Sequence, residues 1–195
     1  MNKFEIEETF IKDIKIITPI PFRDDRGWFM EVFTKKPFKE AGIPTNFVQM
    51  NHSRSIYGVI RGLHFQWSPL MGKLMRVTRG EAFIVAVDIR KNSPTLGKWY
   101  GDYFSEGNKK QMWAPAGFAR GFCSLEDITE VQYLITGTWN PKNESEILWN
   151  DPDIGISWPI GMTPMSPRPE ISAKDAKAQS FKQWLTSENS NKLMI

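Results

Sequence analysis

The chain has 195 residues, of which 41% are hydrophobic and 13% are aromatic. This composition excludes a disordered or collagen-like chain, and the length fits one domain with a full hydrophobic core. The 25 basic and 22 acidic residues give a net charge of +3 and are scattered along the sequence. So mild a charge does not predict nucleic-acid binding, but it leaves arginines and lysines available to meet a phosphorylated small molecule.

The compartment is indicated by three features. Cys123 is the only cysteine, so no disulfide can form within the chain and an intracellular location is expected. The first residues are acidic where a signal peptide needs an apolar core. The longest purely apolar stretch, residues 82–87, is far shorter than the roughly 20 residues that cross a bilayer. We therefore expect a cytoplasmic protein that does not enter a membrane.

Short strand-like runs separated by turns dominate the chain. In chain order they lie at residues 14–20, 27–33, 47–52, 59–66, 73–78, 82–89, 98–104, 111–114, 129–135 and 147–149. Many strands at spacings near ten residues predict an all-β sandwich or barrel.

Two segments have a helical pattern. Residues 36–41 form a short turn, and residues 172–185 form a longer helix with Ser172 as its N-cap. A proline-rich stretch at residues 159–169 joins the β body to this tail. We expect one domain over residues 1–195, in which residues 160–195 are a C-terminal extension that wraps back on the body.

Histidine, the usual acid–base group near neutral pH, is scarce in this chain. Only His52 and His64 are present, and no other side chain titrates near neutrality without help. A catalytic metal in a jelly roll normally takes two or three histidines and a carboxylate, often with a His-x-His pair. The two histidines are twelve residues apart, so the sequence predicts general acid–base chemistry with no metal and no cofactor.

His64 lies within the strand-like run at residues 59–66. Strand alternation places Gln66 on the same face, whereas Arg61 points to the other face unless Gly62 bends the strand. A lone histidine on a strand is more often a core residue than a catalytic one. The polar neighbours of His64 inside this otherwise apolar strand favour a functional site over a core position.

The other candidate residues are ambiguous when each is taken alone. Gly117 and Gly121 flank Arg120, which is typical either of close backbone approach with an anion contact or of an ordinary turn. Several further side chains are more often surface charges, packing residues or first-turn helix residues. These are Lys73, Tyr133, Trp139, Phe29 and Asp175.

Taken in order, nine blocks of the chain resemble the dTDP-4-dehydrorhamnose 3,5-epimerase family. They are residues 22–31 (FRDDRGWFME), 47–53 (FVQMNHS), 59–66 (VIRGLHFQ), 80–90 (GEAFIVAVDIR), 93–97 (SPTLG), 115–122 (PAGFARGF), 147–152 (ILWNDP), 155–159 (GISWP) and 172–175 (SAKD). The resemblance covers about residues 14–180. It implies a cupin-like double-stranded β-helix, or jelly roll, that works without a metal, usually as a homodimer.

The resemblance also implies roles for individual residues. His64 is the general base, Asp175 is its carboxylate partner, Tyr133 is the acid on the opposite face, and Lys73 lies near the keto oxygen. Eight positions match those that hold the nucleotide, the diphosphate or the sugar. They are Arg26, Phe29, Glu31, Gln49, Asn51, Arg61, Glu144 and Lys174.

Three positions depart from the family pattern. Arg120 stands where the family usually has a histidine, Trp139 replaces the second residue of a typical Tyr-Tyr pair, and Ile84 occupies a position that is often aspartate. We expect Arg120 and Trp139 to contact the substrate, with the Trp139 ring able to stack on a nucleobase. These changes alter the surroundings of the acid–base set and leave the set itself intact.

The expected reaction inverts C3 and C5 of dTDP-4-dehydro-6-deoxy-D-glucose to give dTDP-4-dehydro-L-rhamnose. Both carbons flank the C4 ketone, so loss of either proton gives an enolate. An imidazole with an ordinary pKa of roughly 6.5 is a good base near neutrality. Three alternatives remain open: an epimerase of another nucleotide-linked 4-keto sugar at one or both carbons, a 3,4-ketoisomerase of the same fold, and a jelly roll that only binds sugar nucleotides.

Overall fold

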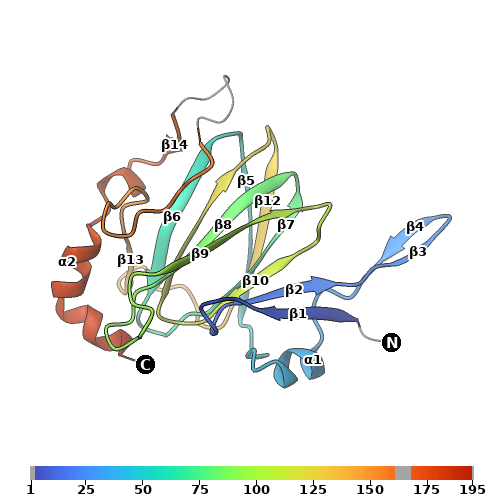
Figure 1. Ribbon diagram of the computed structural model, residues 1–195, viewed down its shortest axis with the longest axis horizontal. Coiled ribbons are helices and arrows are strands. Elements are labelled where there is room, and N and C mark those ends of the chain that lie inside the picture. The colour runs from blue at the N-terminus through green and yellow to red at the C-terminus, as the bar shows by residue number, and fades with distance from the viewer. Residues whose placement is uncertain (1–2, 161–167, 195) are drawn as a thin grey trace.

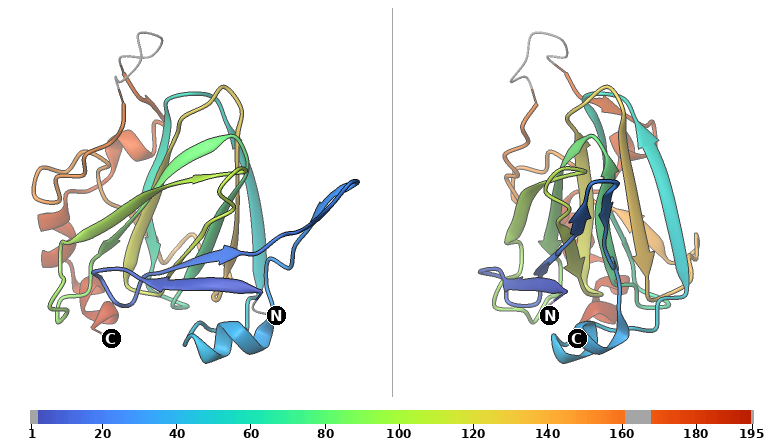
Figure 2. Two further views of the ribbon diagram at one scale, coloured as in Figure 1. Left: turned by 45° about the vertical axis from the view of Figure 1, so that its right-hand side comes forward. Right: turned by 90° about the vertical axis from the view of Figure 1, so that its right-hand side faces the viewer.

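Two antiparallel sheets face each other in the computed structural model, which describes residues 3–160 and 168–194 (Figures 1 and 2). The first sheet has the strand order β1 (Phe4–Glu8), β2 (Lys15–Pro19), β10 (Gln111–Ala114), β7 (Lys73–Arg79), β12 (Thr129–Ile135) and β5 (Gln49–Ser55). The second has the order β13 (Glu144–Glu146), β6 (Val59–Gln66), β11 (Phe118–Ser124), β8 (Glu81–Asp88) and β9 (Trp99–Ser105).

The remaining elements lie outside these two rows of strands. β3 (Phe22–Asp24) and β4 (Gly27–Phe29) form a separate hairpin, and β14 (Glu170–Ile171) pairs in parallel with β6. The helices are α1 (Lys35–Glu40) and α2 (Phe181–Thr186), with 3-10 turns at Asp175–Lys177 and Glu188–Leu193. This architecture confirms the predicted all-β, jelly-roll class with a short helical tail. No helix in the described part of the chain is long and apolar enough to cross a membrane.

Most strands lie where side-chain alternation predicted them. β6, β10 and β12 have the predicted bounds, whereas β1, β3, β11, β13 and β14 were not predicted. The expected strand at residues 27–33 ends at Phe29. The expected strand at residues 147–149 was wrong, because Ile147 forms only an isolated bridge, to Gln179.

The long helix expected over residues 172–185 was also wrong. α2 begins at Phe181, and Ser180 caps it through a capping box with Gln183. Ser172 caps no α-helix; its Oγ accepts a hydrogen bond from the Asp175 backbone N–H at 3.0 Å. The Ser172 hydroxyl therefore fixes the turn that carries Asp175.

The C-terminal segment lies against the outer face of the second sheet (Figure 1). Trp184 is 1% exposed, and its ring lies 4.5 Å from that of Phe65 and 5.7 Å from that of Trp67, measured between centroids. Burial of large aromatic rings is the main source of stability in such a contact. The docking of this segment brings residues 172–177 to the edge of β6, where the 3-10 turn at Asp175–Lys177 contacts the strand.

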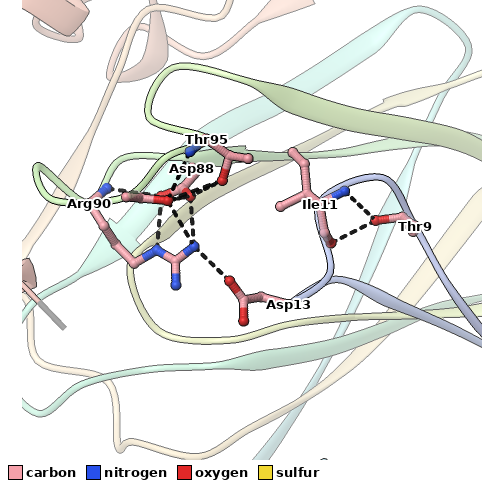
Figure 3. A network of polar contacts seen from close by, with 7 residues as sticks. Thr9, Ile11, Asp13, Asp88, Arg90 and Thr95 are labelled. Carbon is pink, nitrogen blue, oxygen red and sulfur yellow. Dashed lines mark hydrogen bonds and ion pairs between the residues drawn. The ribbon is translucent and has the colours of Figure 1, made fainter.

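A buried polar network fastens the end of β8 (Figure 3). The Asp88 carboxylate is fully buried and accepts hydrogen bonds from Arg90 Nε at 2.9 Å and Thr95 Oγ1 at 2.6 Å, and a further one from Ser93 Oγ. Arg90 also reaches Asp13 at 2.8 Å. Residues 80–90 and 93–97, two of the blocks that resemble the family, thus meet in one hydrogen-bond network. This network joins the β8–β9 connection to the β1–β2 loop.

Loss of the Asp88 charge should destabilise the fold. Burial alone would raise the pKa of Asp88, but the hydrogen bonds from Arg90, Ser93 and Thr95 hold the pKa below its usual value. The carboxylate therefore contributes stability above its unfolded pKa of roughly 4, and this stability is lost as the pH falls through the folded pKa. Asp88→Asn leaves Arg90 without its buried partner, so we expect a loss of about 3–5 kcal/mol in the free energy of unfolding at pH 7.

Urea unfolding of both proteins at pH 7 and at acid pH measures this effect, and the variant should show the smaller pH dependence. Asp153→Asn is the matched control, because Asp153 pairs at 3.0 Å with Lys182, which is 77% exposed, and such surface pairs contribute about 1 kcal/mol or less. Equal losses in the two variants would contradict the assignment.

Candidate active site

The space between the two sheets is apolar at one end and polar at the other. Met75 and Val77 on β7 belong to the core cluster between the sheets, whereas Leu74 packs into the cluster beneath α1. Strand alternation therefore also turns Lys73 inward. Tyr133 packs against the same inner cluster. The first sheet thus presents a lysine and a tyrosine to the interior.

The second sheet presents His64 and Arg120. Leu63 and Phe65 on β6 belong to the outer cluster under the C-terminal segment, which places His64 between them on the inner side. Arg120 on β11 is the direct cross-strand neighbour of His64. The predicted residues His64, Lys73, Tyr133 and Arg120 are thus brought to one interior from two facing sheets.

His64 and Asp175 form a close pair. His64 Nε2 lies 2.7 Å from Asp175 Oδ1, and the two side chains are 27% and 5% exposed. Burial alone would raise the pKa of Asp175, but the His64 contact and the hydrogen bonds from Gly62 N–H and Ser172 Oγ lower it. A carboxylate at Nε2 favours the tautomer with the proton on Nε2, which leaves Nδ1 with a free lone pair.

A pair of touching glycines bends β6 beside His64. Gly62 has φ +138°, and a Cβ there would lie 2.6 Å from Gly121 Cα. The register between β6 and β11 shifts at this point. Arg61 therefore reaches β5 of the first sheet, where its Nε donates to Ser55 Oγ at 3.0 Å. The sequence did not decide whether Gly62 bends the strand; the bend is present and places Arg61 on the inner side. The close approach expected at Gly121 is between two backbones.

Tyr133 and Lys73 lie together on the first sheet. Lys73 Nζ is 5.2 Å from the centroid of the Tyr133 ring. Burial raises the pKa of Tyr133, although a hydrogen bond to Asn51 and the charge of Arg61 oppose this effect. The phenol is therefore protonated at neutral pH. Burial, followed by the charge of Arg120, lowers the pKa of Lys73 to about 7.

Polar residues from β5 and the β12–β13 connection surround this group. Gln49 Nε2 donates to Asn51 Oδ1 at 2.8 Å, and Asn51 lies opposite Tyr133 in the β12–β5 register. The Trp139 backbone N–H donates to Gln49 Oε1 at 3.4 Å, while the residue is 54% exposed. Trp139 therefore presents a large exposed ring beside the polar end of the interior.

An ionic cluster borders His64 on its other side. Lys174 Nζ lies 3.0 Å from Glu144 and 3.3 Å from Glu146. Burial would raise the pKa of Glu144, but Lys174, Trp139 and the charge of His64 lower it. Glu146 lies opposite His64 in the β13–β6 register, and the sequence reasoning missed it. The pairing of β13 with β6 is long-range, so no local pattern signals this contact.

Arg120 differs from the other predicted contacts. It is 2% exposed, and its Nη2 donates to the carbonyl oxygens of Met71 and Pro115, the latter at 3.1 Å. Burial lowers its pKa to about 9. This side chain is therefore turned toward main-chain carbonyls and away from solvent.

Three expected substrate contacts lie apart from this group. Arg26 and Phe29 are on the β3–β4 hairpin and Glu31 directly follows it. The hairpin projects from the sandwich on the side away from α2 (Figures 1 and 2). Phe29 is 67% exposed, and Arg26 pairs only with Asp24 among the described residues. One chain by itself does not bring these three residues to His64.

No metal-ligand cluster was found in the described residues. Within residues 3–160 and 168–194, no three side chains of His, Cys, Asp or Glu are grouped to hold an ion. The expectation of a metal-free site stays a prediction.

Comparison with known proteins gives consistent matches over most of the chain. The family model described as dTDP-4-dehydrorhamnose 3,5-epimerase matches residues 8–183. The enzyme of that name from Pseudomonas aeruginosa is 48% identical over 172 residues, which cover 88% of this chain and 92% of that protein. The one from Salmonella typhimurium is 48% identical over 183 residues, covering 93% and 97%.

A solved structure agrees with these relatives. The crystal structure of dTDP-6-deoxy-D-glucose-3,5-epimerase from Legionella pneumophila, in complex with dTDP-4-keto-L-rhamnose, has a TM-score of 0.89 and 42% identity to this chain. The match covers 96% of both chains. Sequence, fold and matched length agree, so the chain belongs to the dTDP-4-dehydrorhamnose 3,5-epimerase family and is an isomerase of the epimerase type.

Proposed function

We propose that this chain inverts C3 and C5 of dTDP-4-dehydro-6-deoxy-D-glucose, giving dTDP-4-dehydro-L-rhamnose, with His64 as base and Tyr133 as acid. The observation that carries the proposal is the 2.7 Å contact between His64 Nε2 and buried Asp175, on the sheet opposite Tyr133 and Lys73. The bound 4-keto sugar in the Legionella relative supports the choice of substrate.

The first step removes a proton beside the ketone. His64 Nδ1 takes the proton from C3 or C5, and the electron pair moves into the enolate, which places negative charge on O4. Asp175 stays ionised because its pKa is lowered, so it stabilises the imidazolium that forms. An ammonium on Lys73 would offset the charge on O4.

The second step returns a proton to the opposite face. A sugar held between the sheets would present one face to His64 and the other to Tyr133. The raised pKa of Tyr133 keeps its hydroxyl protonated, so it can donate to the carbon and invert the centre. His64 then loses its proton and Tyr133 regains one through solvent before the second carbon reacts, and no cofactor is consumed.

Replacement of His64 should abolish exchange of sugar protons with solvent. In D2O, we expect His64→Gln to slow deuterium uptake at C3 and C5 by about 100- to 10,000-fold, the usual contribution of a general base. NMR of the sugar during incubation measures both positions separately and also reads the C4 carbonyl.

His52→Gln is the matched control, because His52 is 47% exposed and pairs with Glu130. Unchanged exchange in His64→Gln would overturn the assignment of the base. Label at one carbon only would indicate a single inversion, and a 3-keto product would indicate a ketoisomerase.

Replacement of Tyr133 should separate exchange from inversion. In Tyr133→Phe, His64 still removes and returns the proton on its own face, so deuterium should enter with retention of configuration. We expect inversion to slow by about 100-fold or more while exchange persists. Coupling constants in the NMR spectrum distinguish retained from inverted sugar.

Tyr103→Phe is the control, because Tyr103 is 43% exposed and packs on Phe83. Inversion that keeps pace with exchange in Tyr133→Phe would exclude Tyr133 as the acid.

We further infer that the chain works as a homodimer. The β3–β4 hairpin pairs with neither sheet, yet Phe22, Trp28 and Phe29 on it are 43%, 52% and 67% exposed. An isolated two-stranded ribbon with exposed aromatic rings is marginal in water and fits a surface that another chain covers. If Arg26 and Phe29 contact the nucleotide, they would do so in the site of a second copy.

Mixing two inactive variants tests this sharing. In Arg26→Ala and His64→Gln chains expressed together, a mixed dimer has one site without either change if the hairpin acts on its partner. About a quarter of wild-type activity should then return, because about half of randomly formed dimers are mixed and each holds one intact site. No recovery in mixed dimers, verified by mass, would place the hairpin in its own chain's site.

A further inference from the structure

Arg120 is a buried cation without a counter-charge. Within the described part of the chain its guanidinium bonds only to main-chain carbonyls and to no carboxylate, and its Nε and Nη1 are buried without a hydrogen-bond partner. On β8 it faces Ala86, and the diagonal neighbour Ile84 is apolar and buried. A buried, uncompensated guanidinium costs free energy. A role other than stability would account for its presence.

The guanidinium lies beside Lys73. Its Nη2 donates to the carbonyl oxygens of Met71 and Pro115. Met71 is two residues before Lys73, and Pro115 follows Ala114, which pairs with Lys73 in the β10–β7 register. The charge of Arg120 therefore lies against the main chain just before Lys73 and against the main chain just after its cross-strand partner Ala114.

The other groups around Lys73 do not neutralise this charge. The titratable and charged side chains that act on Lys73 or contact it are Arg120 from β11, Tyr133 from β12, Glu144 from β13 and Lys174 from the C-terminal segment. The one carboxylate among them, Glu144, is already paired with Lys174 at 3.0 Å. Burial and Arg120 together lower the pKa of Lys73 to about 7.

We propose that Arg120 is a positioning residue that tunes Lys73: its fixed charge keeps Lys73 partly unprotonated until the negative charge of the bound substrate arrives. This inference rests on the proposed function, in which Lys73 faces the enolate oxygen. The diphosphate and the growing enolate charge favour the ammonium, so Lys73 takes up a proton from solvent as the complex forms. Since Nε and Nη1 of Arg120 are buried, Arg120 acts through Lys73 and does not touch the sugar.

The charge of Lys73 can be measured directly in the ligand-free protein. With lysines labelled with 13C at Cε, the Lys73 resonance is assigned by its loss in Lys73→Met and then followed with pH. We expect a midpoint near pH 7 in the wild type, in line with the lowered pKa of Lys73. Without the neighbouring charge, in Arg120→Gln, the midpoint should rise by at least about half a pH unit.

Arg76→Gln is the matched control, because Arg76 is a partly buried arginine on the same strand and its pKa is lowered by burial alone. It is one residue from Met75, which faces the inner cluster, so it lies on the opposite face from Lys73. A Lys73 midpoint that is unchanged in folded Arg120→Gln would overturn the proposal and leave Arg120 as a tie between residues 71 and 115. If that variant does not fold, Arg120→His serves, because histidine is neutral above about pH 7 and should raise the midpoint likewise.

Two further measurements complete the test. Addition of dTDP-glucose, which has no ketone to react, should raise the Lys73 midpoint in the wild type, and no rise would contradict the response to substrate charge. The value of kcat/KM should fall as the pH rises through the pKa of Lys73 in the free enzyme. This falling limb of the pH profile should move to higher pH in Arg120→Gln. If the Lys73 midpoint rises in Arg120→Gln but the pH profile of kcat/KM stays the same, Arg120 acts on Lys73 but Lys73 has no part in the reaction.

Discussion

The contact between His64 and Asp175 depends on how the C-terminal segment closes onto β6. β14 pairs with the start of β6 at Val59 and Ile60, and β13 pairs with its end from His64 onward. Between these stretches, the Gly62 N–H donates to Asp175 at 3.4 Å. The histidine on the body and the carboxylate on the tail therefore meet only when the tail is docked. Packing of Trp184 on the outer face, far from any chemistry, supports the geometry of the base.

The interior of the sandwich has an apolar end, which stabilises the fold, and a polar end, which carries the reactive groups. At one end, core residues such as Val77 and Val131 on the first sheet and Ile84 on the second exclude water. At the other end the same strands carry charged and phenolic groups. Rigid strands hold these groups without the freedom of loops, which suits a reaction that needs a base and an acid on opposite sides of one ring. The low polarity of the surroundings also strengthens each electrostatic effect, as the lowered pKa of Lys73 illustrates.

The sequence predicted the elements that have a clear period. β6, β10 and β12 alternate or pack in a way that a short window reveals, and these strands carry His64 and Tyr133. β11, which runs from Phe118 to Ser124, was missed because Gly117 and Gly121 around Arg120 resemble a turn. The helix start was misplaced because Ser172 and Ser180 are both good N-caps, and the sequence does not show which one docks.

Local sequence patterns did not predict the parts of the site in which residues far apart in the sequence come together. Asp175 is 111 residues from His64, so only the resemblance to a family linked them, and nothing linked Glu146 to either. Arg120 shows the opposite limit. It was selected from the sequence as a substrate contact, but its burial and its neighbour Lys73 follow from the pairing of β11, β7 and β10, which alternation does not specify. The arginine at position 120 therefore acts on Lys73 through its charge. Which side chain feels that charge is decided by the pairing of strands in three dimensions.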